Sequence, residues 1–317
     1  MRHAPILWLV ALATSFTQPV LAADWPTRPI RIIVPYSAGG AVDILTRLIA
    51  VGMSQSLGQS VLVEPRPGGE GNIAAMAVIN APPDGYTLLS SSSVLTVNPL
   101  MADNLSWKPE DFAPIGRFAT SSGFLVSSAT LPPKTLPEVV NYARSHPGLA
   151  AATVMGAAHT TFTTKLLAKQ AGLEIVTVPY QGAAQHMPDL WEGRVALSTI
   201  SGNLACSALT DPKLRVLAMT GAKRSAIAPD VPTTAEVGFA DVNTGGWYGL
   251  HARAGTPEAV ITKISEALRR ALETDEVKNG LVKACVDIGY QDAKEFGAYV
   301  KTDAERWRRV VADVNNR

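Results

Sequence analysis

Residues 29–53 read PIRIIVPYSAGGAVDILTRLIAVGM. The short β-branched run at 30–34 predicts a strand that ends at Pro35. From Ala41 onward, apolar residues recur at spacings of three and four, which predicts a helix over 41–53. A Gly-Gly turn separates the two. A strand, a glycine turn and a helix in succession are typical of a parallel α/β sheet covered by helices.

The same unit recurs along the chain. Strands are expected at 61–63 and 86–89 with a helix at 72–79 between them, which completes a βαβαβ opening. Later strands are expected at 150–154, 175–178, 195–200 and 214–220, and helices at 136–145, 160–171 and from 187. The C-terminal third is predicted to be helical, with Thr256 as an N-cap, Pro257 at the first helical position, and Asp292 and Glu295 as a capping box.

Two extended segments, 118–127 and 245–250, predict crossings between two lobes. Lobe one would comprise residues 24–123 and 248–317, and lobe two residues 124–247. Such a protein has a cleft between its lobes, and open α/β sheets bind ligands at the carboxyl ends of their strands.

The same division places Cys206 in lobe two and Cys285 in lobe one. Export would put both where disulfides persist. A disulfide, however, requires Cα atoms within about 7 Å of each other. We therefore expect two separate thiols.

Composition excludes several classes of protein. The chain has 317 residues, of which 47% are apolar and 17% charged, and its 28 basic and 27 acidic residues leave a net charge of +1. This balance lacks the basic surface that binds nucleic acid. Two cysteines exclude a cysteine-rich metal module. No metal and no cofactor are predicted.

Residues 1–22 have the pattern of a signal peptide. Arg2 and His3 precede an apolar run at 4–16, and Val20-Leu21-Ala22 offers small residues for cleavage after Ala22. The run is too short for a hydrocarbon core, which needs about 20 residues. An uncleaved anchor is the alternative. We expect an exported, soluble, periplasmic protein, and cleavage would remove Arg2, which leaves 27 basic and 27 acidic residues in the mature chain.

The Gly-Gly turn is the first candidate binding loop. Gly39 and Gly40 would leave backbone amides uncovered where the following helix points its own free amides and positive dipole end. Together with Tyr36, Ser37 and Ala38 they predict an anion site. The loop is neither a P-loop nor a dinucleotide turn. The alternative interpretation, equally supported, is a plain turn in which Asp43 stabilises the helix dipole.

Other loops at strand ends are further candidates. In lobe two, the turn with Gly156, Ala157 and His159 would place a second helix N-terminus opposite the first, so that two carboxylates of one molecule could be held from both sides. For His159 a hydrogen bond that fixes the turn is favoured over catalysis. Polar contacts are expected from loops carrying Tyr180 and Gly182, and from the serine run 90–93 with Ser91 and Ser92.

Arg66 could pair with a ligand carboxylate. Glu64 and Glu70 flank it, however, so a structural ion pair is the favoured role.

Enzyme signatures such as G-x-S-x-G, S-x-x-K and H-E-x-x-H are missing from the sequence. A serine nucleophile within 90–93 with His159 as its base is the remaining alternative, a periplasmic hydrolase, and no motif supports it. The sequence therefore predicts a binding protein and no catalytic residue.

Seven motifs run in order over the mature chain, at residues 25–30, 34–43, 83–88, 178–182, 229–238, 247–250 and 254–257. Together they resemble the Bug family, the TctC-like extracytoplasmic receptors of tripartite tricarboxylate transporters. The resemblance implies a type II periplasmic-binding-protein fold that closes on its ligand like a Venus flytrap. It also implies that backbone amides and ordered waters hold a small carboxylate, with the Gly-Gly loop as the main anchor.

Carried onto this chain, the resemblance implies ligand contacts at Tyr36 to Gly40 with Asp43, at Gly156 to His159, and at Tyr180 and Gly182. The ligand would be a di- or tricarboxylate, an aromatic acid or an acidic amino acid. The implied partner is the membrane permease of the transporter, with a sensor kinase as the alternative, and the receptor would be a monomer. Departures from the family pattern at Glu70 and His186 could instead favour a ligand with an amino group.

Overall fold

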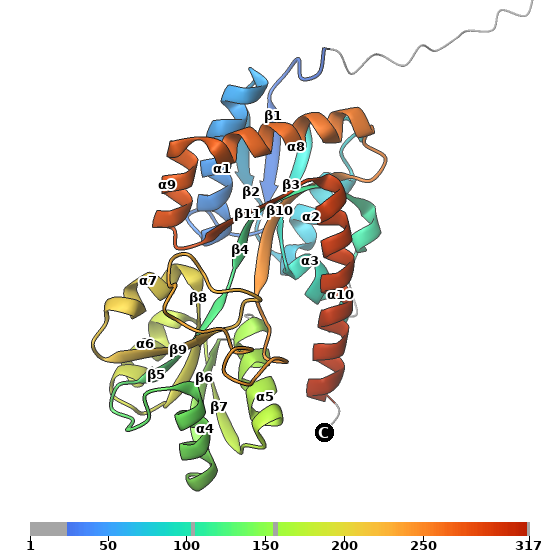
Figure 1. Cartoon of the computed structure of the whole chain (residues 1–317). Helices are drawn as coiled ribbons and strands as arrows, with labels where there is room; N and C mark the ends of the chain where they lie inside the picture. Colours follow the sequence, from blue (N-terminus) through green and yellow to red (C-terminus); the bar gives the residue numbers. More distant parts are fainter. Residues whose placement is uncertain (1–23, 103–104, 155–157, 316–317) are drawn as a thin grey trace, which may run out of the picture.

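The computed structural model describes residues 24–102, 105–154 and 158–315, and shows two α/β lobes, one above the other (Figure 1). The expected signal peptide at 1–22 lies outside the described residues. Within the described ranges, no helix has both the length and the apolar character that a membrane crossing needs.

Lobe one is built on a six-stranded sheet with the order β11-β4-β10-β3-β1-β2. Its strands are β1 (Ile30–Val34), β2 (Val61–Pro65), β3 (Thr87–Ser92), β4 (Phe112–Ser121), β10 (Gly246–Arg253) and β11 (Asp287–Gln291). β1 pairs in parallel with both β2 and β3, which confirms the predicted βαβαβ opening. β10 returns antiparallel to β3 and β4.

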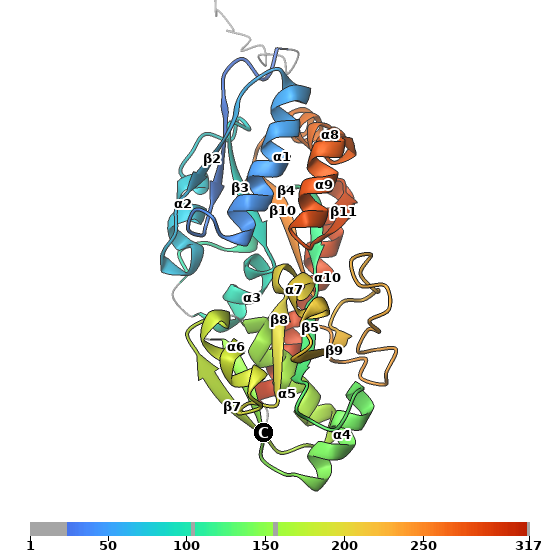
Figure 2. The ribbon, with the colours of Figure 1, turned by 90° about the vertical axis from the view of Figure 1, so that its left-hand side faces the viewer.

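Helices cover both faces of this sheet because successive residues of a strand point to opposite sides. Ile30 and Ile32 pack in one cluster with α1 (Ala41–Leu57), α8 (Glu258–Glu273) and α9 (Asp275–Lys283). Ile33 instead packs in a second cluster with α2 (Asn72–Ile79) and with Phe296 of α10 (Ala293–Asn315). Figure 2 shows α2 on the side of the lobe away from α8 and α9.

Lobe two is built on a five-stranded sheet with the order β7-β6-β8-β5-β9. Its strands are β5 (Gly123–Ser128), β6 (Leu149–Val154), β7 (Ile175–Tyr180), β8 (Leu197–Ser201) and β9 (Leu214–Met219). β6 is parallel to β7 and β8, whereas β5 is antiparallel to β8 and β9. Its helices are α4 (Leu136–Ser145), α5 (Ala158–Ala171), α6 (Ala183–Trp191) and α7 (Gly202–Thr210).

Both predicted crossings are present between the sheets. β4 ends at Ser121 and β5 begins at Gly123, so a single residue joins the two sheets. The second crossing runs through Thr244 and Gly245 into β10. α10 also bridges the lobes, because its Phe296 lies in the core of lobe one and its Trp307 in that of lobe two. The predicted boundaries 24–123 plus 248–317 and 124–247 remain a proposal.

The local predictions fail in three places. Ser90, Ser91 and Ser92 continue β3 as buried residues instead of forming a loop after it. Residues 178–180 likewise belong to β7. Pro257, and not Thr256, is the N-cap of α8, since the Thr256 hydroxyl donates to the Arg253 carbonyl. The Asp292 and Glu295 capping box is confirmed, with Glu295 N donating to Asp292 Oδ1 at 2.8 Å and Asp292 N to Glu295 Oε2 at 3.4 Å.

The expectation of two separate thiols is wrong, because Cys206 and Cys285 form a disulfide with Cα atoms 6.2 Å apart. Cys206 lies on α7 of lobe two and Cys285 lies between α9 and β11 of lobe one. Both segments meet at the junction of the lobes: a Cβ on Gly202, the first residue of α7, would lie 2.9 Å from the Cys285 carbonyl oxygen. Two residues that belong to different lobes can therefore still lie close enough to form a disulfide.

The disulfide closes a loop of 79 residues, so its removal should destabilise the fold. We expect the double variant Cys206→Ser, Cys285→Ser to lose about 4 kcal/mol of unfolding free energy, because the unfolded chain regains the entropy of that loop. Urea unfolding followed by circular dichroism measures the loss. Reduced wild-type protein serves as the control and should match the variant. Equal stability of the oxidised and reduced wild type would contradict the expectation.

Candidate functional site

A cavity of about 350 Å³ lies between the lobes, at the two crossings. The β1–α1 loop, the β3–α3 segment and both crossings contribute to its walls, α3 being Val94–Met101. It is lined by Tyr36, Gly40, Ala41, Val42, Ser92, Ser93, Val94, Val97, Asn98, Ser121, Gly123, Ser201, Thr244, Gly246, Trp247, Tyr248 and Trp307. None of these described lining residues carries a charged side chain. An anion in this cavity would therefore depend on backbone amides and hydroxyl groups.

The Gly-Gly loop is present at the cavity, but its amides are used differently from the prediction. Gly39 has a φ of +79°, and its N–H donates to Asp43 Oδ2 at 2.9 Å. The N–H of Gly40 donates to the Ser37 carbonyl at 3.2 Å. The residues that line the cavity next are Ala41 and Val42, whose amides lie in the first turn of α1 and lack intrahelical acceptors. The amides that remain free to face the cavity are therefore those of the helix start. Ser37 and Ala38 are exposed at the tip of the loop.

The buried side chain of Asp43 hydrogen-bonds to this loop. Its carboxylate is buried and accepts hydrogen bonds from Arg47 Nε and Nη2, each at 2.9 Å, and from Gly39 N. Burial alone would raise the pKa of Asp43, but the hydrogen bonds from Arg47 and Gly39 outweigh it and hold that pKa below its usual value. The side chain is thus fully engaged, which agrees with the interpretation of Asp43 as a residue of the turn.

The pKa of Asp43 is lower in the folded state than in the unfolded state. The ionised carboxylate therefore stabilises the fold at neutral pH, and this stabilisation is lost as the pH falls through the lowered pKa of the folded state. We expect Asp43→Asn to lose about 1–2 kcal/mol of unfolding free energy at pH 7. The difference from wild type should shrink below about pH 4, near the ordinary pKa of an aspartate. Urea titrations at pH 7 and pH 3 measure it. Asp313→Asn, at an exposed pair with Lys169, is the control and should change little at either pH. A difference independent of pH would refute this role.

Tyr36 and Ser92 form the polar edge of the cavity. Their hydroxyl oxygens lie 3.2 Å apart, and both residues line the cavity. Burial raises the pKa of the Tyr36 phenol, and burial also raises the pKa of Tyr248 on the adjoining wall. Both phenols are consequently protonated at neutral pH and available as hydrogen-bond donors.

Ser91, also predicted as a ligand contact, is directed into lobe one instead. Its Oγ lies 2.7 Å from His251 Nδ1 and donates to the Gly249 carbonyl at 3.1 Å. Burial lowers the pKa of His251 to about 3, so the imidazole is neutral. Both side chains are only 2% exposed. Ser91 therefore pairs with His251 in the interior of lobe one, and both residues are shielded from solvent.

The structure describes only some of the residues predicted for the opposite wall. Gly156 and Ala157 lie outside the described residues, and His159 is the second residue of α5. Tyr180 ends β7 and donates from its hydroxyl to Asp189 Oδ2 at 2.6 Å. Gly182 is the N-cap of α6. Neither Tyr180 nor Gly182 is among the residues that line the cavity between the lobes.

Two other side chains raised by the sequence have structural roles. Arg66 pairs with Glu64, its Nη2 lying 2.6 Å from Oε1, which confirms the favoured interpretation. His186 is buried on α6 with its Nε2 3.0 Å from Ser198 Oγ, and burial lowers its pKa. A buried neutral imidazole outside the cavity gives no support to the idea that His186 selects a ligand with an amino group.

Sequence reasoning missed much of the lining at the crossings. Ser121, Gly123, Thr244 and Gly246 flank the points where the chain passes between lobes. Trp307 reaches the cavity from α10. The predicted crossings at 118–127 and 245–250 contain Ser121, Gly123 and Gly246, and Thr244 directly precedes the second of them. The sequence carries no such signal for Trp307, because its helical spacing marks it only as a core residue.

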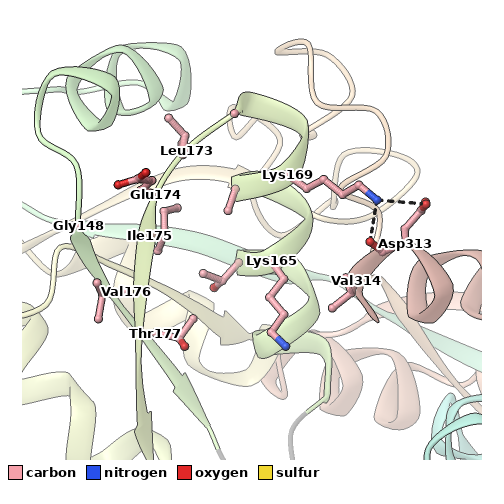
Figure 3. Close-up of a pocket in the computed structure, with 13 residues that line it drawn as sticks. Gly148, Lys165, Lys169, Leu173, Glu174, Ile175, Val176, Thr177, Asp313 and Val314 are labelled. Carbon is pink, nitrogen blue, oxygen red and sulfur yellow. Dashed lines mark hydrogen bonds and ion pairs between the residues drawn. The ribbon is translucent and has the colours of Figure 1, made fainter. Parts of the chain in front are cut away.

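A larger cavity of about 660 Å³ lies on lobe two among α5, β7 and the end of α10 (Figure 3). Its charged residues are of both signs, and Lys169 Nζ is bonded to Asp313 O at 2.7 Å and to Oδ1 at 3.4 Å. It gathers none of the predicted binding residues. We therefore place the candidate site in the smaller cavity between the lobes.

Two α/β lobes joined by crossings around a cavity define the class of two-lobed solute-binding proteins. The family model described as "Tripartite tricarboxylate transporter family receptor" matches residues 45–316. The chain therefore belongs to this family.

Individual proteins are also similar to this chain over most of its length. A relative from Pseudomonas sp. (strain P51), the UPF0065 protein in the tcbD-tcbE intergenic region, is 30% identical over 96% of this chain and 91% of its own length. The structure of R. palustris Rpa4515 with adipate superposes with a TM-score of 0.77 and 31% identity, covering 92% of this chain and 98% of that one. MatC (Rpa3494) from Rhodopseudomonas palustris, with bound malate, gives a TM-score of 0.72 and 28% identity, covering 90% and 100%.

Proposed function

We propose that this protein is an exported receptor that binds a small carboxylate between its lobes and delivers it to the permease of a tripartite tricarboxylate transporter. The observation that carries the proposal is the cavity wall itself. The start of α1 supplies helix N-terminal amides, Tyr36 and Ser92 supply hydroxyls, and no charged side chain is found among the described lining residues. Such a wall suits an anion that donates no proton and needs several hydrogen bonds.

The same wall and the relatives support a proposal for the ligand class. Two solved structures with 28% and 31% identity to this chain hold malate and adipate. Open-chain dicarboxylates are therefore the first ligands to test, followed by tricarboxylates, aromatic acids and acidic amino acids. Gly156, Ala157, His159, Tyr180 and Gly182 stay our proposed contacts for the far end of the ligand, reached when the lobes close. The periplasm, entered through the signal peptide at 1–22, is the proposed location.

The ligand class can be tested by thermal shift with adipate, malate, citrate, benzoate and glutamate. A ligand that binds only the native state raises its stability, by about 2.7 kcal/mol at 100 times Kd. We expect at least one acid to raise Tm at millimolar concentration and to change tryptophan fluorescence, since Trp247 and Trp307 line the cavity. The diamide of adipate is the uncharged control and should do neither. If no acid produces a shift, the proposed function fails.

Gly40→Asp tests the location of the site. The new carboxylate would stand at the start of α1 beside the ligand, where two unit charges about 4 Å apart repel by about 4 kcal/mol at an effective dielectric constant of 20. We expect affinity for the best acid of the panel to fall at least about 100-fold, measured by calorimetry. Gly40→Asn is the matched control, because its Cβ meets the same Ser37 oxygen at 3.2 Å without adding charge. Equal affinities of the two variants would place the anion elsewhere.

A further inference from the structure

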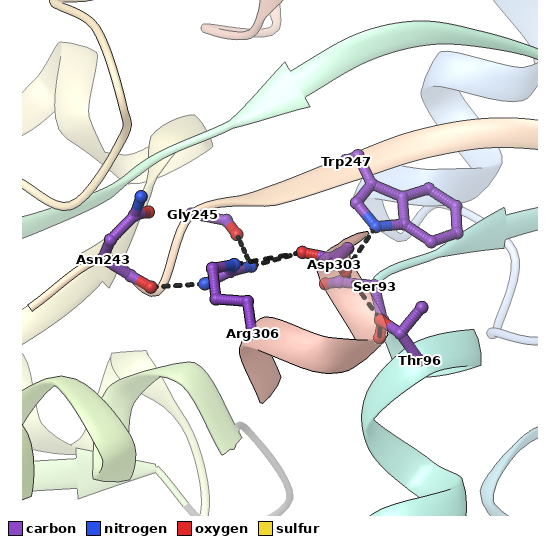
Figure 4. Close-up of polar contacts among 7 residues, drawn as sticks. All are labelled: Ser93, Thr96, Asn243, Gly245, Trp247, Asp303 and Arg306. Atoms are coloured by element: carbon purple, nitrogen blue, oxygen red, sulfur yellow. Dashed lines mark hydrogen bonds and ion pairs between the residues drawn. The ribbon is translucent and has the colours of Figure 1, made fainter. Parts of the chain in front are cut away.

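A buried polar cluster lies behind the cavity, centred on Asp303 of α10 (Figure 4). Asp303 Oδ2 accepts hydrogen bonds from Trp247 Nε1 at 2.9 Å and from Thr96 Oγ1 at 2.7 Å. Its Oδ1 accepts from Arg306 Nε at 3.2 Å and also from Arg306 Nη2. One carboxylate therefore joins α10 to α3, through Thr96, and to β10, through Trp247.

Arg306 extends the cluster to the second crossing. Its Nη1 donates to the Asn243 carbonyl and its Nη2 to the Gly245 carbonyl, the latter at 3.0 Å (Figure 4). These two carbonyls flank Thr244, which lines the cavity, and Gly246 follows them. The Arg306 guanidinium thus hydrogen-bonds to the backbone on both sides of Thr244.

We propose that Asp303 and Arg306 form a positioning pair for the ligand cavity. Neither is among the described residues that line it, yet together they hold three of its walls: α3, β10 and the second crossing. The role assigned to ligand affinity rests on the proposed function, whereas the role in fixing the crossing does not.

The hydrogen bonds of the cluster suit an aspartate at 303 and an arginine at 306. A buried carboxylate is costly unless it is paired and fully hydrogen-bonded, and Asp303, 2% exposed, has four donors. A guanidinium presents several donors in one plane, so it can bond a carboxylate and two carbonyls at once, which a lysine ammonium on its flexible stem cannot do in the same geometry. The pair also cancels the negative charge of Asp303 beside a cavity proposed to hold an anion.

Both tryptophans of the cavity contact the pair. Trp247 donates to Asp303, and the Arg306 guanidinium carbon lies 4.9 Å from the ring centroid of Trp307. A change in the pair would therefore disturb two tryptophans that line the cavity.

Arg306→Lys tests the proposal, with Arg215→Lys as the matched control. Arg215 likewise donates to three carbonyls, those of Ser128, Leu131 and Pro133, but within lobe two and away from the cavity. In the ligand-free protein, we expect hydrogen–deuterium exchange of amides in 243–247 to be at least 10-fold faster in Arg306→Lys and unchanged in Arg215→Lys. Unchanged exchange in Arg306→Lys, or equal acceleration in both variants, would overturn the proposal.

Affinity for adipate, measured by calorimetry, tests the second half of the proposal. We expect a loss of at least 10-fold for Arg306→Lys and less than 2-fold for Arg215→Lys. Faster exchange without a loss of affinity would overturn the positioning role. If neither adipate nor any other acid of the panel binds the wild type, the proposed function fails on its own, and the exchange experiment still decides whether the pair fixes the crossing.

Thr96→Val provides a milder variant should Arg306→Lys fail to fold. It removes the Thr96 hydroxyl, which contacts both Asp303 Oδ2 at 2.7 Å and the Ser93 carbonyl at 2.8 Å, while keeping the shape of the side chain. We expect exchange to accelerate several-fold in 93–98 and also in 301–306 around Asp303, which the loss of the local bond to Ser93 would not reach. Unchanged exchange there would show that the cluster does not hold α3, and would overturn that part of the proposal.

Discussion

Thr220 holds the two crossings together, and the cavity depends on that contact. Its N–H donates to the Gly123 carbonyl at 2.8 Å, its Oγ1 accepts from Gly123 N at 3.0 Å, and its carbonyl accepts from Gly245 N at 3.1 Å. Glycine favours this close approach, since a Cβ on Gly123 would lie only 3.0 Å from atoms of Thr199 and Thr220. Because both crossings are fixed to one residue, the strands that leave them carry Ser121, Gly123, Thr244 and Gly246 to a common cavity.

Two further links act at the same junction. The disulfide ties α7 to the segment before β11, and α10 runs from the core of lobe one to that of lobe two. Any closing rotation of the lobes has to keep the Cα atoms of Cys206 and Cys285, 6.2 Å apart in this structure, within about 7 Å of each other. Such a rotation must therefore pivot close to the disulfide and the crossings, which leaves the far rims of the lobes as the parts that can approach each other.

Much of this fold could be predicted because its signals are local. The apolar spacing of α1, the turn before it and the Asp292 and Glu295 capping box each lie within a few residues of sequence. Longer-range contacts could not be read in this way. The strand through Ser90–Ser92 continues because β10 pairs with it, a partner about 160 residues away, and the disulfide depends on two segments meeting at the junction. The Gly-Gly loop lies between a strand and a helix, as the sequence predicts, but the use of its amides by Asp43 and Ser37 could be seen only in the folded geometry.

The two buried carboxylates among the described residues, Asp43 and Asp303, share one arrangement beside the cavity. Each is paired with an arginine one turn further along its own helix, Arg47 and Arg306. An unpaired carboxylate here would repel an anionic ligand across a short distance of low dielectric. The arginines cancel that repulsion, yet both are committed to their carboxylates, so neither adds a fixed positive charge to the lining. Under the proposed function, attraction to the anion would be left to dipoles, which cost less to desolvate than ions when a ligand binds. A chain with a net charge of only +1 could then hold an anion without a charged side chain among the described lining residues.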